Sequence, residues 1–201
     1  MNSLTYVTSN YGKEVAIKEH FKKEQIEVGY YVYDFDEPNI NDIQFISREK
    51  ARQAYEIIRT PVFVTDSGFF IEDYPNCPNY PGAFVKRSGI ASNVDNLLEI
   101  MKNVKERNCY FLDCLTFYDG EEYHQFLGIG KGTLAYEKRG DLPKHAKSKL
   151  WLVFIPNNCS KTLAEMTDYE RKTRDDGRTS ATEEFIAWYK NNYQKGKVFQ
   201  K

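Results

Sequence analysis

The stretch PVFVTDSGFF, residues 61–70, places a carboxylate at Asp66 directly behind hydrophobic and β-branched residues and ahead of Ser67 and Gly68. This pattern predicts a strand that ends at Asp66. A carboxylate at the carboxyl end of a strand in an α/β sheet reaches the crevice where ligands bind, and Mg²⁺ needs only one or two carboxylates when substrate phosphates complete its ligands. The residues alone leave open whether Asp66 binds a metal or closes an ordinary turn.

A second candidate is the stretch TSNYGK, residues 8–13, which lies between a predicted strand and a predicted helix. Backbone N–H groups and the helix N-terminus favour an anion there, and Lys13 adds a positive charge, so a phosphate could bind beside Thr8, Ser9 and Asn10. The stretch is not a P-loop, because that motif requires a glycine where Val7 stands. The alternative is a polar turn that caps a helix.

Two further groups of charges are candidates. Lys50, in REKARQAY, lies on a predicted helix before the Asp66 strand and either projects a cation toward the same crevice or is solvated. The stretch ERKTRDDGR, residues 170–178, is either a solvated face or a lid over an anion. Its charged side chains include Arg171, Lys172, Arg174, Asp175, Asp176 and Arg178.

The elements that must position these side chains follow from hydrophobic periodicity. Period-two and β-branched patterns predict strands over residues 4–9, 27–35, 61–66, 109–118, 123–130, 132–137 and 150–155. Helical spacing predicts helices after residue 13 and over residues 47–59, 93–104 and 179–193. YDGEEY, residues 118–123, predicts a hairpin turn, and residues 138–149 a loop. Alternating helices and strands with a central hairpin predict an α/β protein, a mixed sheet flanked by helices.

Composition narrows the class of protein. With 201 residues, 41% hydrophobic content and a formal charge of −1, we expect one soluble domain over residues 1–201. The balanced charge gives no broad basic surface for nucleic acid, no segment approaches the roughly 20 apolar residues of a membrane span, and the N-terminus lacks a secretory signal pattern. We therefore predict a cytoplasmic protein. The four cysteines form no C-x-x-C pair, so neither a disulfide framework nor a zinc site is predicted.

Taken in chain order, six stretches resemble the motifs of the inosine triphosphate pyrophosphatase (HAM1-like) family, which hydrolyses non-standard purine nucleoside triphosphates to monophosphate and pyrophosphate. TSNYGK is similar to its T-G-N-x-x-K, EKARQA to x-K-A-x-x-A, and PVFVTDSGFFIE to P-x-x-x-[DE]-D-[ST]-G-L. YPGAF is similar to P-G-x-Y, KGTLAYEKRG to G-x-I-x-x-x-x-R-G, and VFIPNNCSKTLAEMTDYER to V-F-x-P-x-x-x-x-K-T-x-A-E-M-x-x-x-E-K. The match spans nearly the whole chain and implies the family's fold, with a cleft between two lobes.

The resemblance implies roles for residues that match its motifs. Asp66 would bind Mg²⁺ or activate water beside Ser67 and Gly68, and Lys13 and Lys50 would assist catalysis at the phosphates. The triphosphate would be held by Thr8, Ser9, Asn10 and Lys13, with Lys172 and Arg178 as further substrate-binding residues. The resemblance also implies a homodimer.

Departures from the family pattern leave a second interpretation open. Five residues before the matching lysine the family carries a metal-binding glutamate, and here Phe45 stands there; Asp42, Glu49 and Glu72 are candidate replacements. The first acid of the family's acidic pair is Thr65. The alternative is therefore a catalytically degraded member that binds a nucleotide or a protein partner without turnover.

The base-reading motifs depart further. The family's G-F-G-[YW]-D-P is replaced by AKSKLWLV, and its S-H-R-G-[RK] appears as RDDGR, residues 174–178. Since aspartates accept hydrogen bonds, Asp175 and Asp176 favour a base that presents amino groups. The identity of the base is not predicted.

Overall fold

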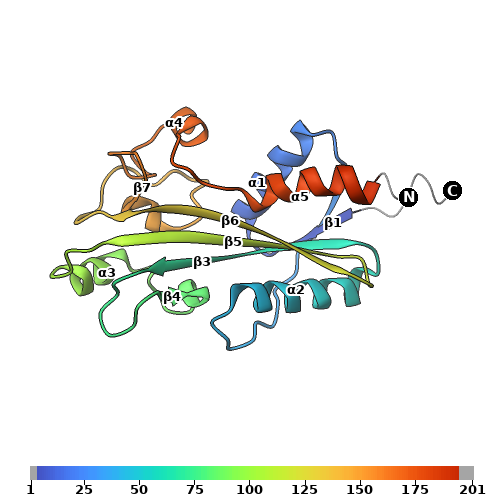
Figure 1. Ribbon diagram of the computed structural model, residues 1–201, viewed down its shortest axis with the longest axis horizontal. Coiled ribbons are helices and arrows are strands. Elements are labelled where there is room, and N and C mark those ends of the chain that lie inside the picture. Colours follow the sequence, from blue (N-terminus) through green and yellow to red (C-terminus); the bar gives the residue numbers. More distant parts are fainter. Residues whose placement is uncertain (1–3, 195–201) are drawn as a thin grey trace.

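A mixed sheet forms the centre of the computed structural model, which describes residues 4–194 (Figure 1). Over these residues the sheet has seven strands in the order β2-β1-β3-β5-β6-β7, with β4 beside β3. The strands are β1 (Leu4–Val7), β2 (Val28–Tyr31), β3 (Val62–Ile71), β4 (Tyr80–Gly82), β5 (Asn108–Tyr118), β6 (Tyr123–Leu134) and β7 (Phe154–Pro156). β1 pairs in parallel with β2 and β3, and the other pairings are antiparallel. The predicted mixed sheet flanked by helices is confirmed.

Five α-helices accompany the sheet in the described part of the chain. They are α1 (Tyr11–Lys23), α2 (Ile43–Ile58), α3 (Val94–Met101), α4 (Asp168–Thr173) and α5 (Ala181–Trp188). In Figure 1, α1 and α5 lie above one half of the long strands, α4 and β7 lie above the other half, and α2 lies below. On one side of the sheet, α1 with α5 and α4 with β7 therefore form two separate groups, and α2 covers the other side.

Buried apolar side chains form three clusters between the sheet and the elements that cover it. Phe63 of β3 packs with α1 and α5, whereas Phe69 and Ile71 of the same strand pack with α3 and β7. Val62 and Val64 point to the opposite face, where α2 covers them. Because β3 contributes to all three clusters, it connects the two halves of the molecule.

β3 also changes its partner on one edge. Its first residues pair with β1 through Val62 and Phe63, and its last with β4 from Phe69 to Ile71. Among the described residues, no strand pairs with β3 on this edge over residues 64–68. The edge of a central strand is therefore open at Asp66, Ser67 and Gly68.

The prediction that the strand ends at Asp66 is wrong. β3 pairs without interruption with β5, from Val62 opposite Tyr118 to Ile71 opposite Cys109, and Asp66 lies opposite Cys114. Asp66 is accessible because β1 and β4 leave a gap beside it, and not because the strand stops.

Several predicted boundaries also differ. Helix α2 begins at Ile43 and not at residue 47, because the Asp42 side chain accepts the backbone N–H groups of Gln44 and Phe45 as an N-cap. The two strands predicted over residues 123–137 are one strand, β6, ending at Leu134. The strand predicted over 150–155 is mostly a 3₁₀ turn (Lys149–Leu152) capped by Ser148, followed by β7. The hairpin at residues 118–123 is confirmed, and the predicted 138–149 loop is irregular up to Ser148, where the 3₁₀ turn begins.

Candidate active site

A cavity of about 630 Å³ lies between the two helix groups, beside the open edge of β3. This volume is within the range of small-molecule sites, roughly 300–1,000 Å³. One half is lined by polar residues of the β1–α1 connection, the segment after β2, helix α2 and mid-β3: Thr8, Ser9, Asn10, Lys13, Asp34, Glu37, Lys50, Asp66, Ser67 and Gly68. The other half is lined by apolar residues and the α4–α5 connection, including Phe111, Leu150, Trp151, Phe154, Arg174, Asp176 and Arg178.

Lys50 joins two carboxylates in the polar half. Its Nζ lies 2.9 Å from Oδ1 of Asp66 and 2.6 Å from Oε1 of Glu37. The Lys50 and Asp66 side chains are only 8% and 13% exposed. Burial alone would lower the pKa of Lys50, but the two carboxylates outweigh it and raise that pKa above its ordinary value. Lys50 therefore carries its positive charge at neutral pH.

The position of Lys50 follows from its phase on α2. The buried face of the helix carries Ile43, Ile46, Ser47, Lys50, Ala51 and Ala54, at spacings of one, three and four residues. A lysine on this face must find an anionic partner, since an unpaired buried charge is costly. Asp66, on the β3 face that α2 covers, is that partner.

Lys13 reaches the same strand from the opposite face. Helix α1 presents it, and its Nζ donates to the backbone oxygen of Thr65 over 3.1 Å at the open edge of β3. Burial lowers the pKa of Lys13, and the nearby charges of Asp66 and Asp113 only partly offset this effect. The side chains of Lys13, Lys50 and Asp66, which are distant in sequence, thus meet at one place in the cavity.

The residues before α1 form a capped turn. The Asn10 side chain accepts the Lys13 backbone N–H at 3.1 Å, and the Thr8 hydroxyl accepts the Asn10 backbone N–H at 3.1 Å. The Ser9 hydroxyl donates to Asp34 at 3.3 Å. The two interpretations of this stretch are therefore compatible, because a turn that caps the helix also lines the cavity.

Gly68 lies where β3 and β4 come close together, at one end of the open edge of β3. A Cβ at this position would lie 2.7 Å from the Phe70 ring and 3.1 Å from the Gly82 backbone oxygen. A side chain could not be added there without moving the junction with β4. Glycine therefore lets Gly82 of β4 and the Phe70 ring lie close to the β3 backbone beside Ser67.

The model of the Ham1 family matches residues 4–188. The chain belongs to the Ham1 family. A relative from Saccharolobus solfataricus named dITP/XTP pyrophosphatase is 33% identical over 189 residues, 94% of each chain. Another of that name, from Thermococcus kodakarensis, is 29% identical over 94% of this chain and 98% of its own.

Solved structures show the same fold. A HAM1 protein from Coxiella burnetii superposes with a TM-score of 0.76 at 19% identity, covering 93% of this chain and 98% of its own. The Ham1 protein of Staphylococcus aureus gives a TM-score of 0.71 at 19% identity, covering 92% and 98%. The family resemblance inferred from the motifs is confirmed.

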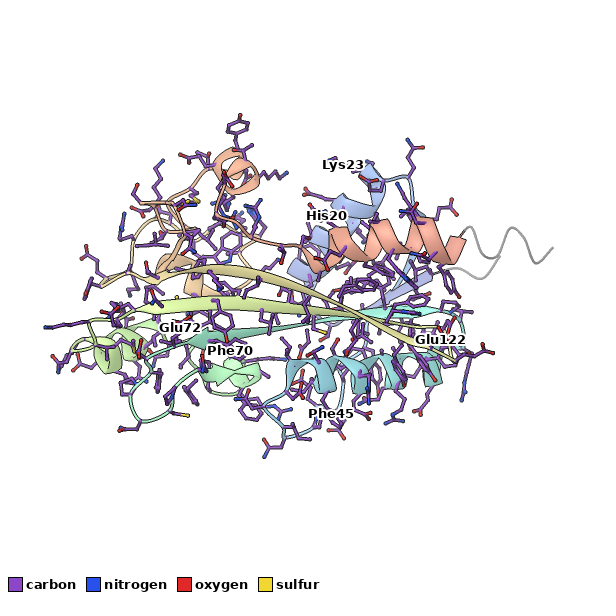
Figure 2. All side chains as sticks on the ribbon, in the orientation of Figure 1. His20, Lys23, Phe45, Phe70, Glu72 and Glu122 are labelled. Atoms are coloured by element: carbon purple, nitrogen blue, oxygen red, sulfur yellow. The ribbon has the colours of Figure 1, made fainter. Side chains whose placement is uncertain are left out.

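The residue that departs from the Ham1 motif at position 45 lies outside the cavity. Phe45 does not line this cavity; it is 38% exposed, lies near the start of α2 below the sheet (Figure 2), and lines a smaller neighbouring hollow to which Glu37 also contributes. The acid that accompanies Asp66 is Glu37, bound to the same ammonium group. Of the three replacements considered from sequence, Asp42 caps α2, Glu49 pairs with Arg52, and Glu72 does not line the cavity.

Sequence reasoning therefore missed Glu37, together with Asp34 and Asp113, which also line the cavity. Burial would raise the pKa of Glu37, but Lys50 and Arg87 outweigh it and hold that pKa below its ordinary value. Arg87 also binds the Glu37 backbone oxygen at 2.7 Å. The acid-rich segment YDFDEP after β2 was the available signal, but only the fold shows which of its acids faces Lys50.

The C-terminal charges divide between the cavity and the surface. The Lys172 side chain is 71% exposed, lies 3.7 Å from Glu19, and does not line the cavity, so the structure does not bring it to the site. Arg178 lines the cavity, but its guanidinium is engaged by Asp176 and by two backbone oxygens. Asp175 is not among the lining residues, whereas Arg174 and Asp176 are.

In the absence of a bound nucleotide, the described residues provide few side chains that could bind a metal ion. Within residues 4–194 no group of three His, Cys, Asp or Glu side chains could hold an ion, and the four cysteines are free thiols. Two carboxylates, those of Asp66 and Glu37, lie beside one another at Lys50. This fits a divalent ion that is held partly by substrate phosphates.

Within residues 4–194, no helix is long and apolar enough to cross a membrane.

Proposed function

We propose that this chain is a nucleoside triphosphate pyrophosphatase that hydrolyses a non-standard purine triphosphate to the monophosphate and pyrophosphate. Curated relatives that cover nearly the whole chain are named dITP/XTP pyrophosphatase. The observation that carries the proposal is the meeting of Lys13, Lys50 and Asp66 in one cavity. Two cations and an acid converging on one space suit a polyphosphate better than a packed interior or a protein surface.

In the proposed reaction, a water oxygen bonds to the α-phosphorus as the bond to the bridging oxygen breaks, which releases pyrophosphate. Lys13 and Lys50 stabilise the charge that develops on this leaving group, because phosphoryl transfer depends mainly on positioning and electrostatics. Asp66 orients the water and accepts its proton. Thr8, Ser9, Asn10 and Ser67 line the place where the phosphates bind.

The cofactor of this proposal is a divalent cation, Mg²⁺, held by Asp66 and Glu37. When bound, it would neutralise phosphate charge and polarise the phosphoanhydride bond. Hard oxygen ligands and few protein carboxylates are typical of Mg²⁺ sites at phosphates, which supports this ion over Zn²⁺.

The assembly and setting are further parts of the proposal. We propose a homodimer, supported by a partly exposed apolar sheet face where Phe70 stacks on Tyr110 with ring centroids 4.8 Å apart and Leu127 is 38% exposed. Free thiols suit a cytoplasmic location, where cysteines stay reduced.

Residues 1–201 act as one domain in this proposal, because β3 contributes to all three apolar clusters.

The experiment that tests the function is a product analysis. The purified chain is incubated with Mg²⁺ and one nucleoside triphosphate at a time, drawn from common, deaminated and modified ones. Pyrophosphate, orthophosphate and the nucleotide products are then quantified. We expect monophosphate and pyrophosphate in equal amounts from at least one non-standard purine triphosphate. Orthophosphate with a nucleoside diphosphate as products would contradict the proposal. Nucleotide binding without any turnover would contradict it as well and would favour the catalytically degraded member.

A further inference from the structure

Five carboxylates of the described residues line the cavity, and Asp113 differs from the other four in having no partner. The other four each bind a cation or a hydroxyl: Asp66 binds Lys50, Glu37 binds Lys50 and Arg87, Asp176 binds Arg174 and Arg178, and Asp34 binds Ser9. Within residues 4–194, the Asp113 carboxylate takes part in no hydrogen bond or ion pair. A partly buried carboxylate in this state keeps its full capacity to accept hydrogen bonds from a ligand.

The position of Asp113 on β5 places it between the two halves of the cavity. Side chains alternate along a strand, so Asp113 shares a face with Leu115 and Phe111, each about 7 Å away along the strand. Leu115 packs with α1 and α5, whereas the Phe111 ring packs on Phe154 of β7, with centroids 4.8 Å apart. β5 runs below both helix groups (Figure 1), and Asp113 therefore lies where the polar half meets the apolar half.

The neighbouring strands determine from which side a ligand reaches Asp113. Ser67 of β3 lies opposite it on one side, and Gly128 of β6 on the other. The start of α5 passes close to Gly128, where a Cβ would lie 2.7 Å from the Ala181 backbone nitrogen, so the cavity is narrow on that side. On the Ser67 side, Lys13 is near enough that the Asp113 charge partly offsets the effect of burial, which lowers the pKa of Lys13. A ligand therefore approaches Asp113 past Lys13 and Ser67.

This location selects the part of a nucleotide that meets Asp113. The phosphates would bind in the polar half, and the apolar walls are left for the base. The sugar joins these two parts, so it passes over the junction of the two halves. A carboxylate repels phosphate oxygens but accepts hydrogen bonds from hydroxyl groups, and acids bind ribose hydroxyls in this way in dinucleotide-binding folds.

We infer that Asp113 accepts a hydrogen bond from a hydroxyl group of the nucleotide sugar and is a specificity-determining residue of the proposed reaction. This inference rests on the proposed function and concerns the same cavity. Asp113 has no part in breaking the phosphoanhydride bond, because the proposed reaction assigns the attacking water to Asp66. The expected consequence is a preference for sugars that carry this hydroxyl, since its absence would leave the carboxylate without a donor.

The test varies the sugar while the base and the triphosphate stay the same. kcat/KM for pyrophosphate release is measured with the ribose, deoxyribose and dideoxyribose forms of the triphosphate that the wild type hydrolyses best. For the wild type, we expect kcat/KM to fall at least about tenfold at one of the two steps of this series, because a hydrogen bond to a charged group is lost there. The step at which it falls identifies the hydroxyl.

Three variants assign this preference to a residue. Asp113→Ala removes the acceptor and should reduce the preference to within about twofold. Asp113→Asn keeps the shape and an uncharged acceptor, so it should retain part of the preference. Glu106→Ala, at an exposed acid just before β5 that does not line the cavity, should retain all of it. Thermal unfolding checks that each variant folds, and Asp113→Asn provides the answer if Asp113→Ala does not.

Other roles of Asp113 would give different results. A role at the attacking water, or a merely structural one, would lower the rates of all three forms by one factor and leave their ratios unchanged. A metal ligand would raise the Mg²⁺ concentration for half-maximal activity. Either result, or a wild type that hydrolyses the three forms equally, overturns the inference while the proposed function stands. If the wild type releases pyrophosphate from no triphosphate, the proposed function itself fails.

Discussion

The two halves of the cavity are built in different ways. The polar half takes three of its charged groups from regular elements, Lys13 from α1, Lys50 from α2 and Asp66 from β3, and Glu37 joins them from the segment after β2. The apolar half takes its polar groups from irregular chain, the segment before β7 and the α4–α5 connection. The first half therefore depends on helix phase and strand register, and the second on contacts between loops.

This difference matches what each half must recognise. A triphosphate presents the same charges whatever its base, so cations on rigid elements suffice to bind it. A base is distinguished by single donors and acceptors, which irregular chain can change without moving the regular elements. In the first half the chain keeps Lys13, Lys50 and Asp66 of the family's motifs but has Thr65 and Phe45 where the family carries acids, and in the second half both base-reading motifs differ.

The largest effect should come from the acid of the polar half. We expect Asp66→Asn to lower kcat by about a thousandfold or more, because it removes the group assigned to the attacking water and one carboxylate of the metal site. The measurement is pyrophosphate release under saturating substrate. Asp95→Asn, at a 73% exposed acid that pairs with Lys138, is the matched control and should retain full activity. Activity of Asp66→Asn within tenfold of the wild type would remove Asp66 from the mechanism.

A somewhat smaller effect is expected from the buried cation. Lys50→Met leaves Asp66 and Glu37 without their shared partner, so we expect kcat/KM to fall about a hundredfold and the free energy of unfolding to drop by about 3 kcal/mol or more. Mg²⁺ should then raise the melting temperature more in the variant than in the wild type, because it can pair with the two carboxylates. Lys18→Met, at a 52% exposed lysine of α1, serves as the control. An unchanged response to Mg²⁺ would contradict a metal site at these acids.

How far the sequence predicts this structure also differs between the halves. Lys13 and Asp66 were found because they stand next to elements with clear hydrophobic patterns, and the family motifs added Lys50. The end of β3 was misplaced because Asp-Ser-Gly is typical of a turn, whereas pairing with β5 continues through it to Ile71. Local propensity was overridden by a long antiparallel partner.

The remaining errors have a common cause. Glu37 was missed because its segment has no periodic pattern, and its place beside Lys50 is set by distant contacts such as that of Arg87. Asp176 was identified, but as a free acceptor, since sequence alone does not show that two arginines within two residues turn toward it. Pairing between side chains of a loop is decided by the folded backbone, which short-range patterns do not specify.

The pH dependence should separate the two lysines. Lys13 has a lowered pKa and loses its charge as pH rises, while the raised pKa of Lys50 keeps it charged. We therefore expect kcat/KM of the wild type to fall on the alkaline side, beginning below the ordinary lysine pKa of about 10.4. Lys13→Met should lower kcat/KM about tenfold and abolish this decline, since the titrating cation is gone. The same decline in the variant would assign it to another group.

The smallest effects test which position provides the second carboxylate of the metal site, Glu37 or residue 45. Glu37→Gln should raise the Mg²⁺ concentration for half-maximal activity about tenfold or more, because a neutral amide is a weaker ligand and no longer pairs fully with Lys50. The measurement is a Mg²⁺ titration at fixed substrate. Glu56→Gln, at a 53% exposed acid that pairs with Arg52, should leave the titration unchanged.

Phe45→Glu tests the position indicated by sequence spacing. It introduces the acid that the family motif led us to expect there, yet residue 45 does not line the cavity. We therefore expect the Mg²⁺ titration to stay within about twofold of the wild type, because an exposed charge outside the site is largely screened. A clear gain in Mg²⁺ affinity would place the metal near the start of α2, and Glu37 would then be only a structural partner of Lys50 and Arg87.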